Sequence, residues 1–400
     1  MRFVKNSFLP IRLIAGLFAV KILVGLLIGF INGYFFNHQT DYDSYNNFGI
    51  IEYDNLLHHP NIFFTDIFKS NYTEYGAFFG SKGSYWNDLR TNILFKFLGF
   101  CNILSGGNYY INSLFFNTIA FLGHVALYRV FIHVYPTKRW SCLFGCFLLP
   151  STLYFSSGIH KDLMVFTALG IFCYCLYFMV QYGISNKKLI YCIICFLGIL
   201  FIRNFIAVLI LPISIAYIIS IKKKWQPWYV LGTLIIMAFL LIIFTQQFVP
   251  SANPLAVVTS KQAAFLDLER ANSQYNVALL NGSLMSFIKA TPTAVRHAFF
   301  SPLPNEFPVK MLNGFTIEMI IYWLLMLLLV WQGKKYNNPN TFVFFMVWFA
   351  VFVFLFTGYI STAAGALVRY RSIYLPFFIT PILCNIQWPN FLNDHTNFSR

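Results

Sequence analysis

Long apolar segments separated by short polar connections dominate this chain of 400 residues. Many of the apolar runs approach 20 residues, the length that a helix rising about 1.5 Å per residue needs to cross a hydrocarbon core of about 30 Å. The pattern predicts an all-α, polytopic membrane protein with about ten transmembrane helices. The expected spans are 11–35, 110–134, 141–157, 162–183, 188–202, 204–221, 228–248, 313–332, 341–357 and 373–387.

Two connections, 36–109 and 249–312, are much longer than the others. In the first, residues 63–68 and 92–98 mix aromatic and polar side chains with the period of amphipathic helices that lie in the membrane interface. No soluble domain interrupts the pattern, so we interpret 1–400 as a single transmembrane domain. A functional site would then have to be built from helix ends and these two loops.

The basic residues indicate an orientation, because they gather at alternate connections. The positive-inside rule places such clusters in the cytoplasm. Both termini are therefore expected in the cytoplasm of a multi-pass protein of the bacterial inner membrane, and both long loops on the outer side. The clusters are Arg2, Lys5 and Arg12; Lys138 and Arg139; Lys187 and Lys188; Lys222, Lys223 and Lys224; and Lys334 and Lys335.

Composition excludes several classes of protein. Charged residues make up 10% of the chain, against about 25% in a soluble globular domain. The net charge of +15 lies in small clusters at segment ends, which indicates contact with anionic membrane lipids and no nucleic-acid partner. A phosphate-binding loop, a dinucleotide fingerprint and a zinc-protease helix are absent. The helically spaced pairs Cys142/Cys146 and Cys192/Cys195 have no flanking His or acid, so no metal site is expected there.

An acidic box with Asp41 and Asp43 follows the first apolar segment, in a chain with 13 acidic residues. In an extended segment, residues two apart point to the same face. A carboxylate at the outer mouth of a helix bundle is suited to act as a general base on a sugar hydroxyl or to attract a cation. The alternative is that these acids only end the first helix and keep the loop hydrated.

A second candidate is the tight outer turn that ends in His160, Lys161 and Asp162. Lys161 lies where the positive-inside rule disfavours a cation. The group is suited to hold an anionic phosphate. The alternative is a capped turn, in which Asp162 interacts with the dipole of the next helix.

Two further cationic elements are expected on the outer side. Arg203 stands alone between two apolar runs, where it either contacts phosphate or extends to the interface. Arg369 and Arg371 flank Tyr370 at the start of the last span, and their alternation is expected to put both cations on one face and the phenol on the other. An Arg side chain offers a planar fork of donors that matches phosphate oxygens.

Together, one acidic and three basic elements on the outer face suit a lipid-linked phosphate donor. The cations would assist departure of the phosphate while a carboxylate activates the acceptor.

At these positions the chain resembles the polytopic glycosyltransferases of the GT-C superfamily. The resemblance rests on the topology, on Asp41 and Asp43 in a long first outer loop, on the Pro-Ser to Lys-Asp turn at 150–162, and on the stretch 365–371 that leads to Pro376. It implies a polyprenyl-phosphate-linked sugar as donor and a glycan or lipid as acceptor, outside the cytoplasm. Asp41 or Asp43 would be the catalytic base. The donor phosphate would be bound by His160, Lys161, Arg203, Arg369, Tyr370 and Arg371.

The resemblance leaves several points open. The acidic box is also similar to that of polysaccharide polymerases of the Wzy and EpsG kind, so transfer and polymerisation are both considered. No cofactor is implied, and a divalent cation is left open. A transporter or flippase of lipid-linked glycans is the rival from another class, and it should carry charges at mid-membrane depth. Only Lys21 and Glu318 have that placement, which favours an enzyme. A structural subunit of an envelope complex is the remaining alternative.

Overall fold

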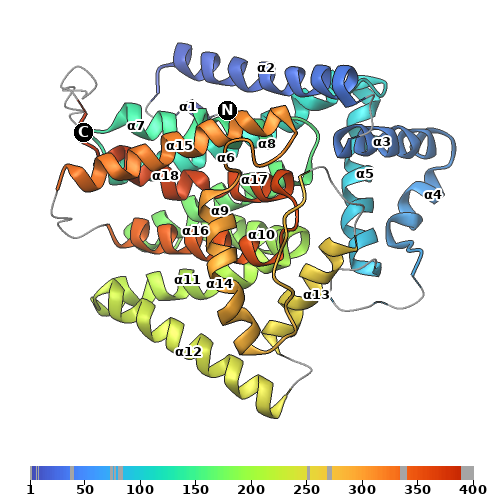
Figure 1. Cartoon of the computed structure of the whole chain (residues 1–400). Helices are drawn as coiled ribbons and strands as arrows, with labels where there is room; N and C mark the ends of the chain where they lie inside the picture. The colour runs from blue at the N-terminus through green and yellow to red at the C-terminus, as the bar shows by residue number, and fades with distance from the viewer. Residues whose placement is uncertain are drawn as a thin grey trace. The chain divides into compact units, whose positions relative to one another are not determined.

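The computed structural model describes residues 2–5, 7, 9–36, 40–72, 75, 78–79, 84–249, 253–267, 273–333 and 340–388. In these ranges every regular element is helical, apart from one isolated antiparallel bridge between Gln274 and Ala363 (Figure 1). The prediction of an all-α protein is confirmed. Lys334 and Lys335, and the tail after Trp388, lie outside the described residues.

Within the described residues, seven helices are long and apolar enough to cross a membrane, which is consistent with a membrane protein. They match seven of the expected spans to within a few residues. These helices are α2 (Ile11–Phe36), α6 (Tyr109–Val134), α9 (Lys161–Tyr182), α11 (Asn204–Lys223), α12 (Pro227–Phe248), α15 (Lys310–Trp331) and α16 (Thr341–Ile360).

The expected count of about ten spans is not confirmed, because three segments form shorter helices. The segment 141–157 is divided into α7 (Arg139–Leu143), a π-helical turn η2 (Phe144–Leu148) and α8 (Pro150–Phe155). Leu149 is extended, as expected for a residue that precedes proline. The segment 188–202 is α10 (Asn186–Ile202), which has 17 residues. The last segment, 373–387, forms only α18 (Leu375–Asn385), which has Pro376 in its first turn, and the short helix α17 (Ala364–Ser372) precedes it.

The chain forms two compact units, each assembled from several stretches of sequence. Unit 1 consists of Met1–Arg129, Thr152–Cys175 and Leu189–Asn204. Unit 2 consists of Val130–Ser151, Leu176–Lys188 and Phe205–Arg400.

In unit 1, most of the described part of the first long connection is helical. It contains α3 (Asp41–His58), α4 (Pro60–Thr65), a 3₁₀ turn η1 (Asp66–Phe68) and α5 (Tyr85–Ser105), and α3 packs along α5. The chain begins with the short helix α1 (Arg2–Lys5).

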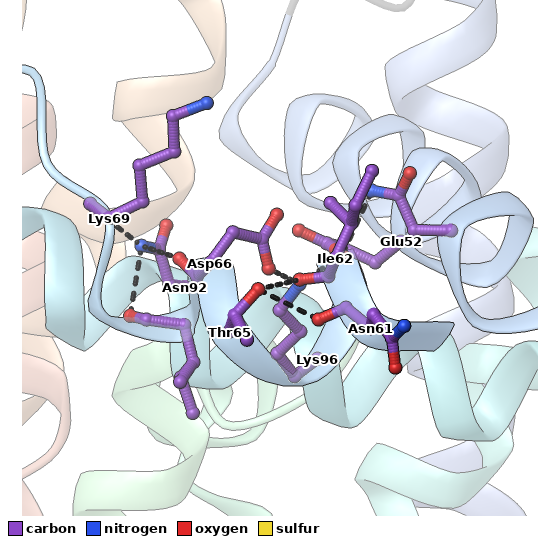
Figure 2. Close-up of polar contacts among 10 residues, drawn as sticks. Glu52, Asn61, Ile62, Thr65, Asp66, Lys69, Asn92 and Lys96 are labelled. Carbon is purple, nitrogen blue, oxygen red and sulfur yellow. Dashed lines mark hydrogen bonds and ion pairs between the residues drawn. The ribbon is translucent and has the colours of Figure 1, made fainter. Parts of the chain in front are cut away.

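The buried Lys96 of α5 ties these helices together. Its Nζ contacts the carboxylates of Glu52 and Asp66 (Figure 2). The same Nζ lies 4.5 Å from the ring centroid of Phe63. One turn earlier, the Asn92 amide donates hydrogen bonds to the carbonyls of residues 67 and 69, at 3.2 and 2.9 Å. The two stretches expected to be amphipathic helices are thus helical, and charged and polar contacts hold them to α3.

Close approach of α6 and α9 completes unit 1. A Cβ on Gly123 would lie 2.7 Å from Cα of Thr167, and one on Gly170 would lie 2.6 Å from the Gly123 carbonyl. Small residues of this kind allow helix backbones to pack closely in membranes. Leu98, Phe116 and other buried apolar side chains form the adjoining core.

In unit 2, the described part of the second long connection contains α13 (Pro254–Leu266) and α14 (Leu284–Phe300), and both pack on α16. Each begins at a residue whose side chain accepts a hydrogen bond from a backbone N–H of the first turn, Asn253 for α13 and Ser283 for α14. Helix α18 packs on α15 and α16.

Candidate functional site

The acidic box forms the first turn of α3 in unit 1. Thr40 precedes the helix in an extended conformation, and its hydroxyl donates a hydrogen bond to Asp43. Residues two apart on a helix point in different directions, so the expectation that Asp41 and Asp43 share one face is wrong. The Asp41 side chain is 57% exposed, whereas Asp43 is 7% exposed. The two carboxylates therefore cannot share one role.

His160 is completely buried and lies between two carboxylates of unit 1. Its Nδ1 is 3.1 Å from Oδ2 of Asp162 and 3.1 Å from the backbone nitrogen of the same residue. Its Nε2 is 3.7 Å from Oδ2 of Asp41. The rings of Tyr42 and Tyr45 lie on α3, with centroids 5.2 and 5.5 Å from the imidazole. Nδ1 is thus held inside the protein, and Nε2 faces the exposed carboxylate of Asp41.

Asp162 and Arg203 form a buried ion pair in unit 1. Oδ1 of Asp162 accepts hydrogen bonds from Nε of Arg203, at 3.0 Å, and from Nη2. Arg203 lies between α10 and α11, and Asp162 is in the first turn of α9. The alternative in which Asp162 interacts with a helix dipole is therefore consistent with the structure. Lys161 is the first residue of α9 and is partly exposed.

Gly158 allows the turn before His160 to adopt its shape. Its φ is +79°, a left-handed conformation that side chains disfavour. A Cβ there would lie 3.1 Å from Oη of Tyr109 and 3.2 Å from the ring of Tyr42. The turn therefore packs directly against the start of α3.

A buried lysine that was not predicted to belong to the site also contacts this turn. Nζ of Lys21, in α2, donates hydrogen bonds to the carbonyl and hydroxyl oxygens of Ser156, at 2.7 and 2.9 Å, and to the Ser157 hydroxyl at 3.3 Å. Nε2 of His124 is 3.2 Å from Nζ and 3.0 Å from the Ser156 hydroxyl. The sequence feature that could have identified Lys21 is its position: an ionisable residue inside an apolar span is rare unless it has a specific partner.

In unit 2, Arg369, Tyr370 and Arg371 lie on the short helix α17, which precedes the last expected span. Arg371 is 2% exposed, and its Nη1 donates hydrogen bonds to the carbonyls of Ala298 and Ser301, at 3.2 and 2.8 Å. These carbonyls end α14, where a cation is favourable. Burial lowers the pKa of Arg371.

Arg369 is only partly exposed, and its guanidinium carbon is 5.3 Å from the ring centroid of the neighbouring Tyr370. Tyr370 itself is 7% exposed. The expectation that both arginines share a face opposite the phenol is therefore wrong, because successive helical residues turn by about 100°.

Glu318, the other ionisable residue expected within a span, is buried in unit 2 and fully engaged. Its carboxylate accepts hydrogen bonds from the backbone N–H of Ser151, at 3.1 Å, from the Ser151 hydroxyl at 3.0 Å, and from the Tyr322 hydroxyl. An anion at the first turn of α8 stabilises that helix start.

The described contacts thus join Asp41, His160 and Arg203 through Asp162 in unit 1, whereas the Arg369–Arg371 group belongs to unit 2. In the part of the chain that the structure describes, no group of three or more His, Cys, Asp or Glu side chains could hold a metal ion. All eight cysteines lie within the described residues, and none forms a disulfide.

Comparison with known proteins gave no match to a family model, to a curated protein or to a solved structure.

Proposed function

We propose that this protein is a membrane glycosyltransferase of the GT-C type, which moves a sugar from a polyprenyl-phosphate-linked donor to a glycan or lipid acceptor. The reaction would take place on the outer side of the bacterial inner membrane, with both termini of the enzyme in the cytoplasm. One observation carries the proposal: an exposed carboxylate, Asp41, adjoins a buried imidazole, His160, whose Nδ1 accepts a hydrogen bond from the backbone N–H of Asp162.

Asp41 is the better candidate for the base because its carboxylate is accessible to an acceptor. It would take the proton of the acceptor hydroxyl as the sugar carbon forms a bond to that oxygen and the bond to the donor phosphate breaks. Its place in the first turn of α3 keeps the negative charge favourable before the proton arrives. Asp43 is buried and accepts a hydrogen bond from Thr40, so its role would be to hold the helix start.

His160 would fix the orientation of Asp41 by presenting its Nε2–H to that carboxylate, because its Nδ1 accepts a hydrogen bond from the backbone N–H of Asp162. Asp162 supports this role, because its backbone N–H holds Nδ1 on the other side of the ring and Arg203 fixes its side chain in a buried setting. A ring fixed from behind costs little reorganisation during the reaction.

Lys161 is the cation of unit 1 that best suits the donor phosphate. It is partly exposed at the first position of α9, one residue from His160. Arg203 and Arg371 are less suitable, because a carboxylate and two carbonyls, respectively, already occupy their guanidinium groups. Of the six residues that the family resemblance implies as phosphate ligands, Arg203 and Arg371 are therefore not proposed for that role.

A transporter of lipid-linked glycans is the second candidate, and Lys21 favours it. A buried amine in a membrane-spanning helix, bonded to His124 and Ser156, is typical of sites along transport pathways. The same contacts have a simpler role in the enzyme, since they hold the turn that leads to His160.

The test is mass spectrometry of polyprenyl-linked and surface glycans in cells that lack the gene, complemented by wild-type protein, by Asp41→Asn or by Asp54→Asn. General-base catalysis contributes about 10²–10⁴-fold to a rate, so Asp41→Asn should fail to restore the missing sugar. Asp54→Asn is the matched control, because Asp54 is an exposed acid on the same helix, paired only with His58 among the described contacts.

Each other outcome has a definite meaning. Full restoration by Asp41→Asn, at equal protein level, would refute the catalytic base. Single repeat units that accumulate without long chains would identify a polymerase. Lipid-linked glycans that build up with their full set of sugars would identify a transporter.

A further inference from the structure

A cavity of about 470 Å³ lies in unit 2 where the turn between α11 and α12 meets the start of α16. Figure 1 shows α11 and α12 as consecutive helices joined by this turn. The volume falls in the range of small-ligand sites, about 300–1,000 Å³. Its polar and aromatic lining comes from Ser220, Lys224, Trp225, Gln226, Trp228 and Thr341.

The turn that forms the cavity has a defined structure. Lys224 has a φ of +55°, which is unusual for a residue other than glycine. The hydroxyl of the buried Ser220 donates a hydrogen bond of 2.8 Å to the carbonyl of Trp225 and closes the turn. This conformation holds Lys224 at the cavity wall.

Positive charge at the cavity is not balanced by the elements that build it. Lys222 and Lys223 end α11 and, like Lys224, are exposed. The sequence contains no Asp or Glu between Asp162 and Asp267, and none within α16. The site is therefore complementary to an anion.

Aromatic side chains give the cavity the character of a membrane interface. Trp225 and Trp228 are each 60% exposed, and Tyr229 is 71% exposed. The ring of Trp228 packs edge-to-face on Phe344, with centroids 4.7 Å apart. Exposed Trp and Tyr beside lysines are typical of the level of lipid headgroups.

We propose that this cavity binds the phosphate headgroup of an anionic membrane phospholipid. The lysines attract the phosphate, Gln226 and Thr341 offer hydrogen bonds, and the exposed tryptophans lie beside the acyl chains. A topology signal would need only the charge of the lysines.

Native mass spectrometry of the full-length protein in detergent tests the proposal, with three probes added separately. These are phosphatidylglycerol, phosphatidylcholine with the same acyl chains, and inorganic phosphate. The wild type should retain phosphatidylglycerol in preference to phosphatidylcholine. Lys224→Gln should weaken retention about fivefold, since a lysine near the surface contributes about 1 kcal/mol to binding anionic lipid.

Lys187→Gln is the matched control. It removes the same charge from an exposed lysine of unit 2, in the first turn of α10, and that residue does not line the cavity. Its retention of phosphatidylglycerol should equal that of the wild type. A third variant, Thr341→Trp, fills the cavity without changing the charge and should also reduce retention.

Three results would overturn the proposal. Equal retention of the two lipids would show that the headgroup charge is not recognised. Equal losses in Lys187→Gln and Lys224→Gln would show a diffuse charge effect rather than a site. Retention of inorganic phosphate without phosphatidylglycerol would identify a site for a free anion instead of a lipid.

Discussion

The buried arginines of the two units differ in what surrounds them. In unit 1, Arg203 neutralises Asp162, which in turn holds His160 next to the exposed Asp41. In unit 2, Arg371 donates hydrogen bonds to carbonyls at the end of α14. The first chain of contacts reaches an exposed reactive group, whereas the hydrogen bonds of Arg371 to Ala298 and Ser301 end at backbone carbonyls. An arginine found in a sequence therefore indicates a functional site only when the groups that its guanidinium contacts are known.

The largest expected effect comes from breaking the ion pair of unit 1. Arg203→Met leaves the Asp162 carboxylate buried without its main partner, which costs about 3–5 kcal/mol. The thermal unfolding temperature in detergent should fall steeply. Asp162→Asn combined with Arg203→Met should recover part of the loss, because no uncompensated charge then remains. Equal losses in the single and double variants would mean that the pair is not coupled.

The next effect concerns the arginine of unit 2. Arg371→Met removes charge-assisted hydrogen bonds to two carbonyls, and we expect a loss of about 3 kcal/mol in the free energy of unfolding. Arg369→Met is the control on the same helix, and it should cost well under 1 kcal/mol because that side chain is partly exposed. Thermal unfolding of both variants measures the difference. A larger cost for Arg369→Met would contradict the capping role of Arg371.

A smaller loss of stability is expected at Gly158, in the turn before His160, and a glycine in a turn away from the site serves as the comparison. Gly158→Ala should cost about 1–2 kcal/mol for the left-handed conformation and also displace Tyr42 and Tyr109. Gly183→Ala has the same backbone cost, since φ of Gly183 is +93°, but a Cβ there meets nothing within 4 Å. Glycan analysis should therefore show a loss of product for Gly158→Ala alone. Normal product from Gly158→Ala would separate this turn from function.

The smallest effect is a pH dependence in unit 2. His297 stacks on Tyr275 at 4.2 Å, and burial, followed by the charge of Arg296, lowers its pKa below 6.5. A lowered pKa in the folded state means that stability is complete above about pH 6.5 and is lost as the pH falls through the folded value. The unfolding temperature of the wild type should thus fall between pH 7.5 and 5 more steeply than that of His297→Gln. Parallel slopes in the wild type and His297→Gln would refute this account.

The sequence predicted the long helices well, because a span depends on local apolar runs. It did not predict the break at Leu149 or the separate short helix α17. The proline at 150 was visible, but its effect depends on what packs around the freed backbone groups. The acidic box was misjudged for a similar reason: Asp41 and Asp43 were expected in an extended loop and instead begin a helix.

The sequence was enough to predict the candidate residues, but not the groups that they contact in the folded protein. Arg203 is 41 positions from Asp162, and Arg371 is 70 positions from Ser301. A single sequence contains no information on such distant pairs, so it could not distinguish a phosphate ligand from a buried ion pair. Lys21 shows the reverse case, because a charge inside an apolar span was itself the signal.

The most direct test of the account compares Asp41→Asn with Arg371→Met for sugar transfer per molecule of folded protein. Polyprenyl-linked and surface glycans are measured by mass spectrometry, and folded protein by size-exclusion chromatography of the same cells. The account predicts that Asp41→Asn is folded and forms no product, whereas Arg371→Met is less stable but active for each folded molecule. An active Asp41→Asn protein, or a folded Arg371→Met protein without product, would contradict it.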